Sequence, residues 1–179
     1  LGYLLELLAK SEQEAMVAVK FEYLGSSIVA ILFMMFIYNY CGAKENVLLE
    51  RILLMCGFIT VILVWTSSNH TLYYTDVEFV YSGIYPHLNL SYGPGFYFYM
   101  LTCTVIPWGL SVLMLIKSCF KIKNVKRNEK IKIIIGGATI AISILVIYVF
   151  KVFPEGYDPT PVTMAVLFTT LVVFVWNRK

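Results

Sequence analysis

The sequence predicts an all-α fold, a polytopic bundle of transmembrane helices that carries a small β-hairpin lid on its outer side. Of 179 residues, 59% are hydrophobic and only 14% are charged, whereas soluble domains carry roughly 25% charged residues. Several apolar runs reach the length of about 20 residues that a bilayer span requires. The basic residues are also distributed unequally between the connections, which fixes an orientation.

Five full spans and one truncated span are predicted in a single transmembrane domain that covers residues 1–179. The segment Leu1–Ala9 is apolar but too short to cross a bilayer, so we expect it to be the end of a helix whose first half precedes Leu1. The five full spans follow in order: Phe21–Cys41, Val47–Ser68, Gly95–Cys119, Ile131–Val152 and Pro161–Trp176.

Basic residues predict which side of the membrane each connection faces. Eleven of the fourteen Lys and Arg fall on one side of the predicted spans, and the connection 69–94 contains none. Basic connections remain in the cytoplasm. We therefore expect 69–94 outside and the C-terminus inside. A net charge of +3 reflects this topology rather than nucleic-acid binding.

The ends and irregularities of the helices are also marked. Ser11 and Glu14 form a capping box, which predicts a helix from near Glu12 to about Tyr40, longer than the span that it contains. Thr160 followed by Pro predicts the start of the last span. Pro107 predicts a kink within its span.

The connection 69–94 is too long for a bare loop. Val77–Tyr81 and Leu88–Tyr92 are rich in strand-forming residues, and Ser82–Pro86 between them carries turn signals. These patterns predict the short β-hairpin lid.

Glu6 and His70 each have two possible roles, one structural and one functional. Glu6 lies in an apolar helix, where a carboxylate is costly; it either pairs with Lys10 four residues later or binds a ligand or proton. His70 either caps a helix or contacts a stimulus.

Aromatic residues gather at the outer side, where they form an interfacial belt or line a pocket between helix ends. The candidate ligand-binding residues of that pocket are Glu6, Glu22, Trp65, Asn69, His70, Tyr73, Tyr92, Phe96, Tyr99, Asp158 and Thr160.

Metal and cofactor chemistry is not indicated. The four cysteines include no CxxC pair, none lies in an outer connection, and no zinc-type cluster is present. We expect no cofactor and no catalytic residue.

Five short motifs, in order along the chain, resemble the N-terminal seven-transmembrane sensor region of prokaryotic histidine kinases. They are Leu1-Gly-Tyr-Leu-Leu-Glu6, Phe21-Glu-Tyr-Leu-Gly25, Trp65-Thr-Ser-Ser-Asn-His70, Ser91-Tyr-Gly-Pro-Gly-Phe96 and Tyr157-Asp-Pro-Thr-Pro161. The chain departs from the pattern at Ala30 and within 136–143, where prolines are common.

The resemblance implies a missing first span with its N-terminus outside, and a cytoplasmic kinase or cyclase module after Lys179. It implies that the chain itself is a receptor rather than an enzyme. Expected partners are the bilayer, an unidentified small-molecule or lipid stimulus, and a second copy of the full-length protein.

A transporter or channel is the alternative function, but such a protein should show internal repeats, or broken helices with charged residues at the midplane of the membrane. A membrane enzyme, which would need clustered catalytic side chains, ranks third.

Overall fold

The computed structural model describes residues 2–44, 46–81 and 87–121, together with Val162, Ala165, Val166 and Thr169. The chain divides into two compact units, Leu1–Ser111 and Val112–Lys179, and the first holds the hairpin and the clusters of packed side chains described below. The predicted spans Ile131–Val152 and Pro161–Trp176, and the predicted start of the last span at Thr160, lie outside the described residues or are covered only by isolated positions.

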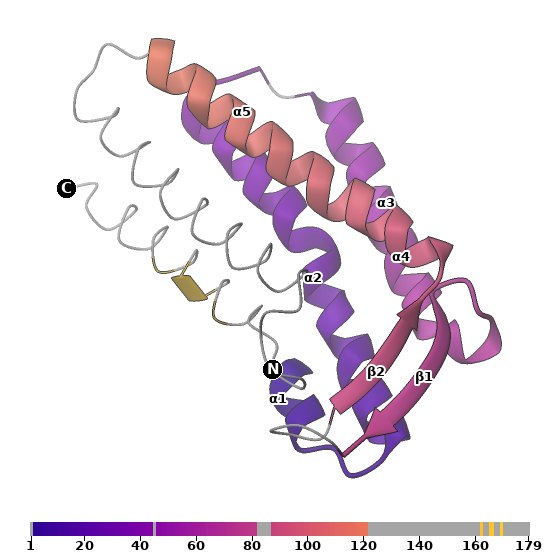
Figure 1. The fold of residues 1–179 in the computed structure, drawn as a ribbon. Coiled ribbons are helices and arrows are strands. Elements are labelled where there is room, and N and C mark those ends of the chain that lie inside the picture. Colours follow the sequence, from indigo (N-terminus) through magenta and orange to yellow (C-terminus); the bar gives the residue numbers. More distant parts are fainter. Residues whose placement is uncertain are drawn as a thin grey trace. The chain divides into compact units, whose positions relative to one another are not determined.

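Three candidate membrane spans occur within the described residues, and the count expected for the whole chain, five full spans and one truncated span, stays a prediction. They are Glu12–Cys41, Val47–Trp65 and Pro94–Ser118, and each contains or overlaps a predicted span. The elements, shown in Figure 1, run in the order α1 (Gly2–Leu7), α2 (Glu12–Cys41), α3 (Val47–Trp65), the 3₁₀ turn η1 (Ser67–Asn69), β1 (Tyr74–Val80), β2 (His87–Tyr92), α4 (Pro94–Tyr99), the π-helix η2 (Met100–Val105) and α5 (Ile106–Lys121).

Local interactions fix both ends of α2. The Ser11 hydroxyl accepts a hydrogen bond from the Glu14 N–H at 3.3 Å, as the capping motif predicts, while the Glu14 carboxylate accepts from the Lys10 N–H at 2.8 Å. At the other end Gly42 adopts φ 63° and donates its N–H to Asn39. Glycine adopts this left-handed conformation without a steric penalty, so the helix ends there.

The predicted hairpin is present, with its first strand beginning three residues earlier than expected. β1 pairs antiparallel with β2, and the register includes Tyr74 opposite Tyr92 and Val77 opposite Leu90. The pairing shifts between Tyr74 and Asp76, so one extra residue of β1 bulges at this point. The predicted turn Ser82–Pro86 lies outside the described residues.

The hairpin packs on the N-terminal turns of α2 that extend before the span. A buried cluster joins Ala15 and Val19 of α2 to Tyr74 of β1 and Leu88 of β2. The Tyr81 hydroxyl also donates to the Lys10 carbonyl at 3.2 Å. The apolar side of the protruding helix is therefore the surface that holds the lid.

A second cluster fills the space between the spans. It consists of Ile31 and Met34 from α2, Leu53 from α3 and Cys103 from η2. The π-helix that contains Cys103 lies directly before Pro107, where the sequence predicts a kink. Because proline clashes with the carbonyl four residues before it, the wider π turn, with Ile106 N–H bonded to Leu101, accommodates the ring at this place.

Candidate functional site

A cluster of six aromatic rings lies where α2, the hairpin and α4 meet. The Tyr23 ring contacts the Tyr73 and Tyr99 rings edge-on, with centroids 5.4 and 5.2 Å apart. Tyr73 contacts Tyr74 in the same way at 4.9 Å. We refer to Tyr23, Tyr73, Tyr74, Tyr92, Phe96 and Tyr99 as the aromatic cluster.

The two strands and α4 complete the cluster at its exposed edge. Tyr92 stacks on Phe96 with centroids 3.8 Å apart and an interplanar angle of 15°, and it lies 6.2 Å from Tyr74, its partner across the hairpin. Tyr73 is fully buried, whereas Tyr92 is 43% exposed. The cluster therefore extends from the interior of the unit to its surface.

Two glycines allow the approach that brings these rings together. The Gly93 N–H donates to the Tyr73 carbonyl at 2.8 Å, and the Gly95 N–H donates to the Leu72 carbonyl at 2.7 Å. A Cβ atom at Gly93 would lie only 2.6 Å from the Leu72 carbonyl oxygen. Any larger residue would thus push the start of β1 away from the start of α4.

Two carboxylates act electrostatically on this cluster. Burial is the main reason that the pKa of Tyr74 lies above its ordinary value of 10.0, and the charges of Tyr92, Glu22 and Glu6 raise this pKa further, whereas the Tyr23 hydroxyl lowers it. Glu6 comes from α1 and Glu22 from α2. These two helices pack so closely that a Cβ atom at Gly2 would lie 2.7 Å from the Glu22 Cβ.

The hydroxyl oxygens of Tyr73 and Tyr74 are buried and make no hydrogen bond among the described residues, although the Tyr23 hydroxyl lies near both. Buried polar groups without partners are rare and occur often at functional sites. Burial is also the main reason that the pKa of Tyr73 lies above its ordinary value.

His70 lies outside the aromatic cluster, after the end of α3, and its side chain contacts Thr66, the C-cap residue of that helix. The Thr66 hydroxyl donates to the Ile62 carbonyl at 2.7 Å and so accepts from the His70 Nε2 at 2.9 Å. The Leu72 N–H approaches the His70 Nδ1 at 3.3 Å. Both ring nitrogens of His70 therefore have hydrogen-bond partners within residues 66–72, and whether the residue also contacts a stimulus stays a prediction.

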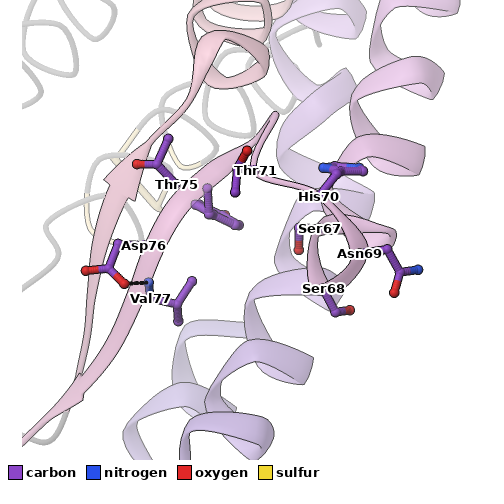
Figure 2. Close-up of a pocket in the computed structure, with 9 residues that line it drawn as sticks. Ser67, Ser68, Asn69, His70, Thr71, Thr75, Asp76 and Val77 are labelled. Carbon is purple, nitrogen blue, oxygen red and sulfur yellow. Dashed lines mark hydrogen bonds between the residues drawn. The ribbon is translucent and has the colours of Figure 1, made fainter.

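A hollow of about 380 Å³ separates this helix end from β1. Figure 2 shows its walls: one is formed by residues 67–71, the other by Thr75, Asp76 and Val77 of the strand. The Asn69 side chain points away from the strand in this view, and the Asp76 carboxylate accepts from the Val77 N–H at 3.1 Å. Tyr74 also lines the hollow, and it is the residue that this hollow shares with the aromatic cluster.

Comparison with known proteins assigns the chain to a family. The family model described as the N-terminal 7TM region of histidine kinase matches residues 1–179. The chain belongs to this family. No curated protein and no solved structure matches it. The chain is therefore a sensor-type 7TM region and not a catalytic domain.

Within this sensor region, the structure brings together a subset of the predicted site residues. Glu6, Glu22, Tyr73, Tyr92, Phe96 and Tyr99 belong to the aromatic cluster or act on it. Asn69 and His70 line the separate hollow, and Trp65 donates its indole N–H to the Lys20 carbonyl at 3.3 Å. Asp158 and Thr160 lie outside the described residues.

Sequence reasoning missed Tyr23 and Tyr74 as members of the cluster. Tyr23 lies one turn after Val19, which is buried on the same side of α2, and this i, i+4 spacing is the signal that could have identified it. Tyr74 could not be assigned to either face of its strand, because the bulge after it shifts the alternation of side chains.

Proposed function

We propose that the aromatic cluster, with Glu6 and Glu22, receives a small-molecule or lipid stimulus from outside the cell. The single observation that supports this proposal is the convergence of α1, α2, both strands and α4 on one group of aromatic rings, of which Tyr73 and Tyr74 are buried, beside the carboxylates of Glu6 and Glu22. A ligand that contacts such a group differently in two arrangements of these elements shifts the balance between the arrangements. Of the remaining candidates, Trp65, Asn69 and His70 are the proposed surroundings of this site, and Asp158 and Thr160 stay candidates on the grounds of the sequence alone.

The signal then passes to the cytoplasm through the last span, Pro161–Trp176, and reaches a kinase or cyclase module in a dimer of the full-length protein. The basic connection 120–130 supports a cytoplasmic C-terminus, because basic connections remain inside. Membership in the histidine-kinase sensor family favours this function over transport.

The proposal is tested with conservative variants of the natural full-length protein in membrane vesicles. Glu22→Gln removes one charge from the cluster, and Tyr92→Phe removes one hydroxyl at its exposed edge. Each should change the basal output, measured as autophosphorylation or cyclic-nucleotide synthesis, by at least about threefold, since roughly 0.7 kcal/mol shifts a two-state balance that far.

Glu78→Gln is the matched control. Glu78 is exposed on β1 and lies opposite Asn89 of β2, so the same chemical change should leave the output at its original level. If the Glu22 and Tyr92 variants insert normally and their output equals that of the control, the cluster does not receive the stimulus.

A further inference from the structure

A second candidate binding site lies on the surface near the C-terminal end of α3, where α3 lies beside α2. The Lys20 carbonyl accepts a hydrogen bond from the Trp65 indole N–H at 3.3 Å. The Lys20 ammonium lies 3.5 Å from the Ser68 hydroxyl. These contacts hold one cation, one indole and one hydroxyl side by side, at the last residue of α3 and the first residues of η1.

Exposed apolar residues continue from this group along both helices. On α2 they are Phe21 and Leu24, which are 49% and 44% exposed; on α3 they are Phe58, Ile62 and Trp65, which are 67%, 47% and 45% exposed. Their spacing of three or four residues places each set on one helix face. The Phe21 and Trp65 rings meet at 6.1 Å and join the two faces into one surface.

The Lys20 ammonium gives this surface a positive charge at the end where Trp65 and Ser68 lie. An ammonium group has three donors, and the Ser68 hydroxyl occupies one of them. Glu22, two residues after Lys20, lies about 200° around the helix from it, on the side of α2 that contributes to the charge around Tyr74. A cation above an exposed apolar surface in a membrane protein is complementary to an anionic lipid.

We propose that Lys20, Ser68 and Trp65 bind the phosphate group of an anionic phospholipid, whose acyl chains lie along the exposed faces of α2 and α3. The Lys20 ammonium and the Ser68 hydroxyl donate to phosphate oxygens, and the Trp65 ring packs at headgroup depth, where tryptophan is enriched. This lipid site uses another face of α2 than the aromatic cluster does and none of the cluster's residues, although Trp65 also belongs to the proposed surroundings of the stimulus site.

The site is tested by native mass spectrometry of the purified protein in mixed micelles. The probes are phosphatidylglycerol and phosphatidylcholine with identical acyl chains, at equal concentration. The protein should retain one phosphatidylglycerol in preference to phosphatidylcholine. Lys20→Met should weaken this retention roughly fivefold, the effect of about 1 kcal/mol per basic residue near a lipid surface. Ser68→Ala should weaken it as well.

Lys10→Met is the matched control, because Lys10 is an exposed lysine in the connection between α1 and α2 and its side chain lies outside the site. It should retain phosphatidylglycerol like the unchanged protein. Equal retention of the two lipids, or equal retention by the Lys20 and Lys10 variants, would overturn the proposal. Displacement of the lipid by millimolar glycerol phosphate would also overturn it, since the site would then recognise a free phosphate rather than a lipid.

Discussion

Tyr74 connects several features of the molecule at the scale of a single residue. Its ring is 3% exposed, its hydroxyl has no hydrogen-bond partner among the described residues, and the charges of Glu6 and Glu22 act on it. A buried hydroxyl without a partner destabilises the folded state, because it loses its hydrogen bonds with water and gains none in return.

Tyr74→Phe should therefore not lower the stability of the protein at neutral pH and should raise it by up to about 1 kcal/mol. Thermal unfolding in detergent, followed by tryptophan fluorescence, measures this effect. A loss of more than about 1 kcal/mol would show that the hydroxyl has a stabilising partner.

The same residue predicts a dependence on alkaline pH. The pKa of Tyr74 is raised in the folded state, so the fold favours the neutral side chain over the ionised one. This advantage in the free energy of folding is complete below the ordinary pKa of 10.0. It is lost as pH rises above 10 towards the folded-state pKa, since the unfolded chain releases the proton first. Tyr74→Phe should reduce the fall in unfolding temperature between pH 10 and 11, and an equal fall in the variant and the unchanged protein would contradict this prediction.

At the scale of elements, the junction between the hairpin and α4 depends on close backbone packing. Gly93→Ala would place a methyl group 2.6 and 2.7 Å from the Leu72 and Thr71 carbonyl oxygens, neither of which belongs to a flexible side chain. We expect a loss of about 1–3 kcal/mol in unfolding free energy, the usual range for overpacking. Gly25→Ala is the control, because nothing lies within 4 Å of an added Cβ there; equal stability of the two variants would contradict the role of this junction.

The last span is the proposed link to the output module. Insertions can change the angle at which the helix enters this module. One residue inserted after Trp176 rotates the output module by about 100° relative to the span, if the helix is continuous. The output of the natural full-length protein should vary strongly and periodically when one to four residues are inserted. A constant output across the series would indicate a flexible tether instead of a helical link.

The elements that the sequence predicts best are those with strong local signals. The capping residues Ser11 and Glu14 located the start of α2, and strand-forming residues on both sides of Ser82–Pro86 located the hairpin. The π-helix before Pro107 was beyond sequence reasoning, because a proline in a span predicts a disturbed helix but not which hydrogen bonds replace the lost one.

Packing between distant segments accounts for the parts of the site that were not predicted. Glu22, Tyr92 and Phe96 were expected to line one outer pocket together with His70, but a shared outer location does not specify which side of the bundle a residue faces. The division into an aromatic cluster and a separate hollow results from the contacts of Leu72 and Tyr73 with Gly93 and Gly95, which bring together residues about 20 positions apart. Such contacts leave no periodic signal in the sequence.

At the scale of the whole molecule, the proposed sensor function requires that the connection 69–94, which contains the hairpin, faces the exterior. The basic connection 120–130 must then face the cytoplasm. Both the stimulus site and the relay through the last span depend on this orientation. The distribution of basic residues predicts it, and the family to which the chain belongs is consistent with a multi-pass membrane protein.

Cysteine labelling in intact cells measures this orientation most directly. The four native cysteines are first replaced by serine, and Glu78→Cys in β1 or Lys126→Cys in the basic connection then provides a single thiol. A membrane-impermeant maleimide should modify the Glu78→Cys protein in intact cells and should modify the Lys126→Cys protein only after the cells are permeabilised. Labelling of the Lys126→Cys protein in intact cells, with protection of the Glu78→Cys protein, would contradict the orientation and with it the proposed sensing of an external stimulus.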